Sequence, residues 1–180
     1  AGVALAHLAL AVALLGYAAS TYASDQALLA AAAPGDAAEA GGRAFVLAPA
    51  SPRLDAQGRL DAIDAALALD GDGAIPVRFE WTGAPGEHYA GRLAVRRTLA
   101  EDVYVSPLAF RTADGWVSSN GPSMAKLDPS GVEAVSVRVT VLPLVGLVWA
   151  GLALLLLAMG MVLAGTLWEG SRARAASPAR

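Results

Sequence analysis

Few side chains in this sequence are of types that do chemistry, and they lie far apart. Histidine occurs twice: His7 is in the apolar run "LAHLALAVALLGYAAS" (5–20), and His88 is in "GEHYAG", beside a turn that predicts a surface position. The chain has no cysteine, which excludes disulfides, thiolate metal sites and cysteine nucleophiles. Neither a G-x-S-x-G motif nor a phosphate-binding P-loop occurs. We therefore assign no catalytic residue and expect no catalysis by this chain alone.

His7 stands in a setting that a polar side chain normally avoids. A strongly polar group inside a membrane span is costly and usually faces protein or a cofactor. Three interpretations compete: His7 bonds a neighbouring helix, ligates the iron of a b-type haem through its neutral imidazole, or reaches water near the membrane interface. The alanines at i−3 and i+4, Ala4 and Ala11, leave room for a flat ring or a close helix. The residues alone therefore leave the alternatives open.

The other charged groups favour simpler interpretations. Glu101 and Asp102 are an acidic pair near a strand start, which predicts a solvated edge rather than acid–base chemistry. Arg92, Arg96 and Arg97 form a basic run that could meet an anion such as a haem propionate or a lipid phosphate. A solvated strand face is the interpretation that we favour for this run.

Both ends of the sequence have the composition of membrane spans. Hydrophobic residues make up 56% of the chain, and residues 1–20 and 144–168 contain no Asp, Glu, Lys or Arg. A bilayer core requires about 20 helical residues. We predict transmembrane helices over 1–22 and 143–168. For the first, a cleaved signal peptide ending at "YAS" before Asp25 is the alternative, which the missing basic flank and the long apolar run disfavour.

The second predicted span carries residues suited to helix contact and to the membrane surface. Gly146–Ala150 and Gly160–Ala164 are small-xxx-small pairs, which permit close approach of another helix. Trp149 and Trp168 bracket the span as candidate interface anchors, and Pro143 suits a first helical turn.

The charge distribution predicts the orientation. Residues 169–180 form a basic tail with Arg172, Arg174 and Arg180, which is expected on the cytoplasmic side. The middle of the chain is then periplasmic or its equivalent. Residues 21–133 hold 15 of the 16 acidic residues and carry a net charge of −6, so nucleic acid is not an expected partner.

The middle of the chain reads as a linker followed by strands. Residues 23–42 predict a linker, because "AAAPGDAAEAGG" (31–42) is small and low in complexity; a short Ala-rich helix in 31–42, ended by Gly41, is the alternative. Residues 43–142 contain strand-like runs, among them 43–48, 88–97 and 102–110.

Two patterns within the predicted strands are particularly clear. The runs 61–69 and 74–81 flank "DGDG" (70–73), which predicts a hairpin; the alternative, a calcium loop, lacks the other ligands that an EF-hand requires. In 132–142, valines alternate with Ser136, Arg138 and Thr140, as in a strand with one buried face. The predicted fold is an α+β membrane protein: two transmembrane helices flank an extracytoplasmic antiparallel β-domain of six to eight strands, a small sandwich or barrel.

Three segments, in order, resemble one known family. They are "LAHLALAVALLGYAAS" (5–20), "EDVYVSPLAF" (101–110) and "VSVRVTVLPLVGLVWAGLALLLLAMGMVLAG" (135–165). They resemble the C-terminal portion of CcmF, the large membrane subunit of the bacterial haem lyase in cytochrome c maturation. The resemblance covers nearly the whole chain but only that part of the family.

The resemblance implies a role for His7. In that family, the histidine of the first segment is an axial ligand of a b-haem within the membrane, and this haem supplies electrons to the haem being attached to apocytochrome c. Its counterpart here is His7, with haem b as the implied cofactor. Ala9 replaces the family's glycine, and the Trp-rich haem-presenting loop, the periplasmic histidines and the second b-haem ligand have no counterpart in this sequence. Either a partner polypeptide supplies the second ligand, or this chain is a relic module with another role.

The resemblance implies a C-terminal module of a membrane haem lyase assembly in the bacterial inner membrane, split from a longer ancestor. Its role would be one b-haem ligand and a periplasmic docking domain, with the remaining haem lyase segments as partners. The alternative is a structural accessory subunit of a larger respiratory or photosynthetic membrane complex, with no cofactor of its own and with His7 only packing or hydrogen bonding.

Overall fold

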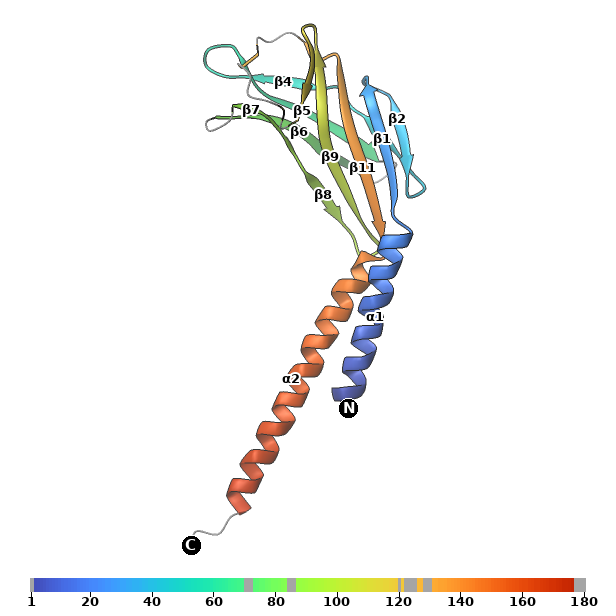
Figure 1. Cartoon of the computed structure of the whole chain (residues 1–180), viewed down its shortest axis with the longest axis vertical. Coiled ribbons are helices and arrows are strands. Elements are labelled where there is room, and N and C mark those ends of the chain that lie inside the picture. Colours follow the sequence, from blue (N-terminus) through green and yellow to red (C-terminus); the bar gives the residue numbers. More distant parts are fainter. Residues whose placement is uncertain are drawn as a thin grey trace. The chain divides into compact units, whose positions relative to one another are not determined.

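A computed structural model describes residues 2–69, 73–83, 87–119, 121, 126–127 and 131–176, with side chains up to residue 169 (Figure 1). The chain divides into two compact units. The helical unit consists of Ala1–Ala23, Thr98–Glu101 and Pro143–Arg180. The β-domain consists of Ser24–Arg97 and Asp102–Leu142.

Antiparallel strands build the β-domain. Eleven strands occur among the described residues, more than the six to eight expected from the sequence. They are β1 (Asp25–Ala32), β2 (Ala37–Ala40), β3 (Arg43–Leu47), β4 (Ser51–Leu54), β5 (Leu60–Leu69), β6 (Gly73–Thr82), β7 (His88–Arg92), β8 (Ala94–Arg97), β9 (Glu101–Thr112), β10 (Gly115–Ser118) and β11 (Ala134–Pro143).

The strands form two sheets. One sheet has the order β1-β11-β9-β10, and β8 also pairs with β9. The other has the order β2-β3-β5-β6-β7, and β4 also pairs with β5. Buried apolar side chains from both sheets form one cluster, so of the two predicted shapes the domain takes the sandwich (Figure 1).

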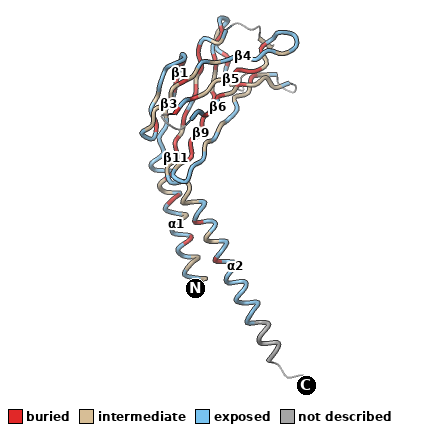
Figure 2. The backbone as a smooth tube through the Cα atoms, turned by 180° about the vertical axis from the view of Figure 1, so that it is seen from behind, coloured by how far each residue is buried: buried red, intermediate tan, exposed pale blue. Residues whose placement is uncertain are grey.

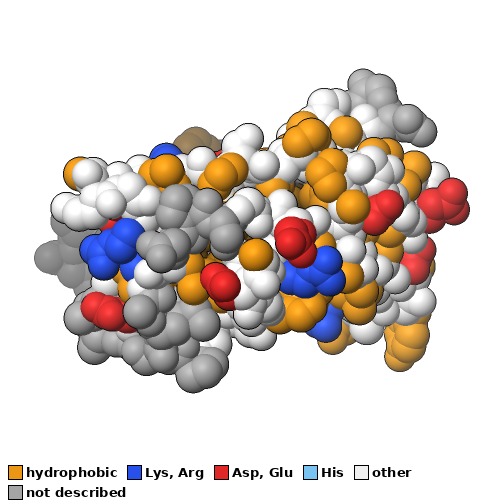
Figure 3. Space-filling view, turned by 90° about the horizontal axis from the view of Figure 1, so that it is seen from above, with side chains coloured by type: hydrophobic (Ala, Val, Ile, Leu, Met, Phe, Trp, Pro, Cys, Tyr) orange, Lys and Arg blue, Asp and Glu red, His pale blue; other side chains and the backbone are white. Residues whose placement is uncertain are grey.

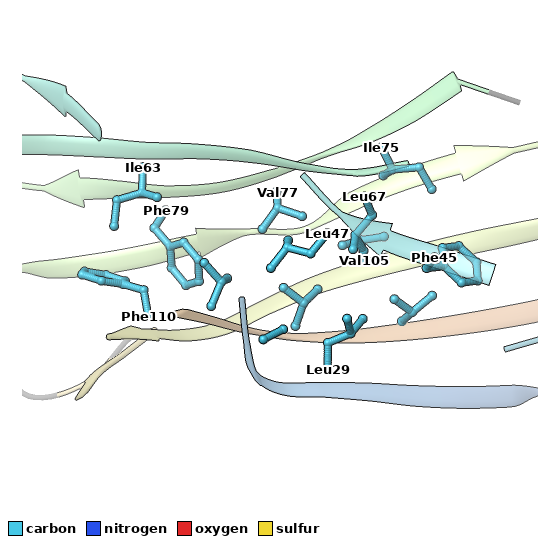
Figure 4. Packing of buried hydrophobic residues seen from close by; sticks show 14 of the residues in the cluster. Leu29, Phe45, Leu47, Ile63, Leu67, Ile75, Val77, Phe79, Val105 and Phe110 are labelled. Atoms are coloured by element: carbon cyan, nitrogen blue, oxygen red, sulfur yellow. The ribbon is translucent and has the colours of Figure 1, made fainter. Parts of the chain in front are cut away.

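Aromatic rings join the two sheets in the core. Phe79 of β6 and Phe110 of β9 are fully buried, and their ring centroids lie 5.2 Å apart in an edge-to-face arrangement (Figure 4). Tyr89 of β7 meets Phe110 at the same distance. Such pairs contribute about 0.5–1.5 kcal/mol beyond the burial of their area. The rings therefore fix one end of the sandwich.

The predicted alternation in the last strand is confirmed. In β11, Val135, Val137, Val139 and Val141 are at most 1% exposed, whereas Arg138 is exposed. The predicted hairpin is confirmed as well: β5 and β6 pair antiparallel from Ala62↔Glu80 to Leu69↔Gly73. Residues 70–72 of its turn, and with them the calcium alternative, lie outside the described residues.

Strands occupy much of the segment that was predicted as a linker, 23–42, and the helical alternative is wrong. β1 pairs antiparallel with β11, with Asp25 opposite Val141. β2 joins β3 through Gly41 and Gly42, whose φ angles are +59° and +70°. A two-residue hairpin turn of type I′ has positive φ at both central residues, which glycine permits. Alanine carries little strand preference, so the pairing, rather than local propensity, decides the structure here.

The run 88–97, predicted as one strand, is divided between the sheets. β7 pairs with β6 in one sheet, and β8 pairs with β9 in the other. Gly91 lies close to β9, because a Cβ on this residue would stand 2.5 Å from the Pro107 carbonyl oxygen. The chain therefore crosses between sheets where a glycine permits close backbone approach.

The helical unit contains two long apolar helices, α1 (Gly2–Tyr22) and α2 (Val145–Ala176). Both Gly2–Tyr22 and Val145–Glu169 are long and apolar enough to cross a membrane. Much of their surface is exposed (Figure 2). Pro143 ends β11 instead of starting the helix as predicted, and Leu144, with φ +56°, makes the turn into α2.

Small residues bring the two helices together. A Cβ on Gly151 of α2 would lie 2.6 Å from the Ala13 nitrogen and 2.7 Å from the Ala9 oxygen of α1. A Cβ on Gly16 would lie 2.7 Å from Leu147 Cβ. Because later residues of α1 meet earlier residues of α2, the helices run antiparallel.

The small-xxx-small pairs proposed from the sequence are not the contact between these helices. A Cβ added to Gly160 would meet no described atom within 4 Å, and Gly146 faces the Leu99 backbone of the Thr98–Glu101 turn. Gly151 makes the close contact instead, because it lies on the helix face that α1 covers.

Candidate functional site

His7 projects from α1 on the side away from α2. Its side chain is exposed, whereas Ala9, two residues along, is fully buried against α2. Two helical residues are about 200° apart around the axis, so His7 and Ala9 belong to opposite faces. The small residues that hold the helices together thereby leave the imidazole open to a neighbour outside this chain.

One hydrogen bond orients the imidazole. Nδ1 of His7 lies 2.8 Å from the carbonyl oxygen of Val3, one helical turn earlier. A carbonyl only accepts hydrogen bonds, so Nδ1 is the donor, and in the neutral ring Nε2 carries the lone pair. Metal-ligating histidines commonly donate their other ring N–H to a backbone carbonyl in this way. The bond to Val3 therefore leaves Nε2 of His7 as the ring nitrogen without a partner on α1.

The second histidine belongs to the β-domain. His88 begins β7 and is partly buried, with the Thr82 hydroxyl 3.3 Å from its Nδ1 and donating to its carbonyl at 3.0 Å. His88, which was predicted at the surface, is therefore partly buried and contacts Thr82 of the neighbouring strand β6. Among the described residues, no group of three or more His, Asp or Glu side chains could hold a metal ion.

The arginine run lies around a hollow of the β-domain. Arg92, Arg96 and Arg78 line an open pocket of about 600 Å³, together with apolar side chains of β6 and β8. Arg92 pairs with Glu80 at 2.8 Å, and Arg78 lies 3.2 Å from Asp64. Basic and acidic side chains adjoin one another on the face shown in Figure 3. The solvated face expected from the sequence is therefore a lined pocket with paired arginines.

Asp102 departs from the solvated edge that was expected. It is 3% exposed, its Oδ2 lies 3.8 Å from Arg97 Nε, and the Tyr104 hydroxyl donates to it at 3.4 Å. The first residues of β9 pair with β8, which covers this carboxylate. Arg97 therefore acts as a partner of Asp102 rather than as part of the pocket.

A cluster around Lys126 went unnoticed in the sequence. Lys126 Nζ donates to Asp55 Oδ2 at 2.8 Å and to Asp61 Oδ1 at 3.0 Å, and its side chain is only 10% exposed. The bond from Lys126 is the main cause that lowers the pKa of Asp55 to about 2, and the same bond raises the pKa of Lys126. The acids lie more than 60 residues before Lys126, so no local pattern could have revealed the cluster.

The buried Tyr89 also holds the region around Lys126 through hydrogen bonds. Its hydroxyl donates to the Leu60 carbonyl at 2.7 Å and accepts from the Leu127 N–H at 3.3 Å. Burial raises the pKa of Tyr89. The charges of the cluster are paired and the Tyr89 hydroxyl is hydrogen-bonded. The cluster therefore has a structural role: it attaches Lys126 and Leu127 to the sheet.

The fold has a counterpart among solved structures, although no protein-family model and no curated protein sequence matches the chain. The matching structure is "Cytochrome c Heme Lyase CcmF", with a TM-score of 0.56 and 20% sequence identity. The match covers 87% of this chain and 23% of that chain, so this chain spans about a quarter of its length. At that identity the match shows the fold, and this chain therefore has a CcmF-like arrangement of two apolar helices around an antiparallel β-domain.

Proposed function

We propose that this chain is the C-terminal module of a membrane haem lyase assembly in cytochrome c maturation. The CcmF-like fold supports this proposal. Both helices would span the bacterial inner membrane, with the β-domain periplasmic and the basic tail cytoplasmic. Attachment of haem would require the remaining segments of the lyase as well.

The observation that carries the proposal is the hydrogen bond from His7 Nδ1 to Val3. It leaves Nε2 as the coordinating atom, on a face that α2 does not cover. We propose His7 as one axial ligand of a b-type haem. When bound, that haem supplies a one-electron redox centre; the work of this chain is to hold the imidazole in one orientation. A partner helix would bring the second ligand and cover the exposed face.

Haem in the complex that is purified from the native membrane with its partner proteins tests the proposal. The complex is held in a mild detergent, and the haem that co-elutes with this chain on gel filtration is measured. We expect a b-type spectrum after reduction, with haem in proportion to this chain. His7→Ala should abolish co-elution. His88→Ala, which changes the chain's other histidine, should leave it intact. Equal haem content in wild type and His7→Ala would contradict the ligand assignment.

The accessory-subunit alternative predicts a different pattern. The exposed face of α1 around His7 would then contact a neighbouring helix without any cofactor. Purification from the native membrane would recover the same partner proteins without haem, and His7→Ala would release those partners. Recovery of respiratory or photosynthetic subunits, with no maturation proteins, would favour this alternative.

A further inference from the structure

The pocket around Arg78, Arg92 and Arg96 has the composition of a site for an amphipathic anion. The three side chains come from three strands, β6, β7 and β8, so the fold, rather than one local run, collects them. The rest of the lining is apolar and comprises Ala74, Ile75, Pro76, Leu93, Ala94 and Val95. Leu93 remains 58% exposed and Val95 37% exposed. A phosphate with an apolar body attached would satisfy both parts of this surface.

The ion pairs of the pocket leave hydrogen-bond donors for a ligand. Glu80 Oε2 accepts from both Nε and Nη2 of Arg92, at 2.9 and 2.8 Å. A guanidinium has five N–H donors, so this one oxygen fixes the orientation of the group without using all of them. Nε of Arg78 is buried beside Asp64 Oδ1, 3.2 Å away, so this atom is not among the donors that a ligand can reach. Planar guanidinium groups held in this way suit the oxygens of a phosphate.

The position of the pocket in the chain indicates the source of the anion. Arg96 and Arg97 immediately precede the Thr98–Glu101 turn, which belongs to the helical unit. In that unit the Leu144 N–H donates to the Ala100 carbonyl at 2.6 Å, at the start of α2. Leu99 of the same turn is 96% exposed, as suits a residue in contact with lipid.

We propose that this pocket binds the phosphate of an anionic phospholipid, with the apolar lining against its glycerol and upper acyl region. The proposal rests on the membrane placement given under Proposed function but not on haem. His7→Ala should therefore leave lipid binding unchanged, which separates the failure of one proposal from that of the other.

Native mass spectrometry of the full chain in a nonionic detergent provides the test. The protein is titrated with short-chain phosphatidylglycerol, with phosphatidylcholine of the same chain length, and with inorganic phosphate. We expect phosphatidylglycerol to bind at least about tenfold more tightly than either of the others, since the arginines would repel the choline cation of phosphatidylcholine and inorganic phosphate has no apolar body to bury. Equal binding of the two lipids, or equally tight binding of inorganic phosphate, would overturn the lipid assignment.

Matched variants locate the binding. Arg92→Gln should weaken phosphatidylglycerol binding about tenfold or more, because Arg92 is largely exposed and lines the pocket. Arg111→Gln, which breaks a comparable exposed pair with Glu133 at 3.0 Å, should have no effect. Glu80→Gln should strengthen binding by removing a competing carboxylate, whereas Glu133→Gln should not. Equal losses in Arg92→Gln and Arg111→Gln would overturn the proposed site, as would unchanged binding in Glu80→Gln.

Discussion

At the scale of single residues, Lys126 shows how ion pairs with acids far away in the sequence can hold residues 126–127 in place. Its ammonium group joins Asp55 and Asp61, and Leu127, beside it, is bonded to the buried Tyr89 hydroxyl. These contacts attach the described residues 126–127 to the sheet that carries β5 and β7. Losing the lysine would leave two carboxylates close together without their shared cation.

This cluster predicts a loss of stability in acid. The pKa of Asp55 in the folded protein is about 2, below its ordinary value of 3.8. The ionised carboxylate therefore stabilises the folded state fully above pH 3.8, and this stabilisation is lost as the pH falls through about 2. In Lys126→Gln the free energy of unfolding should be lower at neutral pH and should fall less steeply across this range. Urea unfolding of the full chain in detergent, followed by near-UV circular dichroism, measures both quantities.

The control for this prediction is Arg111→Gln, which removes an exposed ion pair elsewhere in the β-domain. Its acid dependence should match the wild type. A Lys126→Gln protein with the wild-type slope between pH 3.8 and 2 would show that the cluster does not control the titration of Asp55.

The sequence predicted some of these single-residue features and missed others. His7 could be singled out because a histidine is conspicuous in an apolar run, but its bond to Val3 and its exposed face required the structure. Asp102 was expected to be solvated and is buried, because the chain before it folds back as β8. Long-range partners of this kind leave no periodic signal.

At the scale of elements, the pairing of α1 with α2 depends on a glycine that pattern reasoning overlooked. The sequence offers two small-xxx-small pairs in α2, Gly146–Ala150 and Gly160–Ala164, and Gly151 belongs to neither, so this spacing does not identify the contact. Gly151 makes it because its helix face meets Ala9 and Ala13. Gly160 points to open space.

This difference predicts opposite effects for the same substitution. Gly151→Ala should destabilise the helix pair by about 1–3 kcal/mol, because its methyl group would overlap the α1 backbone. Gly160→Ala should be neutral or stabilising by up to about 1 kcal/mol, since alanine favours helix and finds free space. Unfolding by sodium dodecyl sulfate, followed by far-UV circular dichroism, measures both. Similar behaviour of the two variants would contradict the proposed packing.

At the scale of the whole molecule, the order of helix, β-domain and helix was predictable because it rests on composition. The charge-free apolar runs indicate membrane-spanning helices, and the alternating valines indicate a strand with one buried face. The number of strands was underestimated because β1 and β2 are rich in alanine and β7 and β8 are continuous in sequence. Their places depend on which edges of β11, β3, β6 and β9 were free to pair.

The proposed membrane orientation gives a prediction for the whole chain. Since the chain has no native cysteine, Ser51→Cys in β4 and Ala179→Cys in the tail can each be labelled alone. In spheroplasts, a membrane-impermeant maleimide should modify Ser51→Cys, whereas Ala179→Cys should react only after lysis. Labelling of Ala179→Cys in intact spheroplasts would reverse the assigned orientation.

The pairing of Asp25 with Val141 places the two ends of the β-domain next to each other, as in a domain that can be exchanged for another. Partners in an antiparallel ladder have Cα atoms about 4.5–5.5 Å apart, so the polypeptide comes in and goes out through nearly one point. Domains with adjoining termini tolerate transplantation. A bridge of two or three residues can therefore join residues 24 and 142. Replacing 25–141 would also remove the Thr98–Glu101 turn of the helical unit, so a grafted domain with similarly close ends would have to supply a turn in its place.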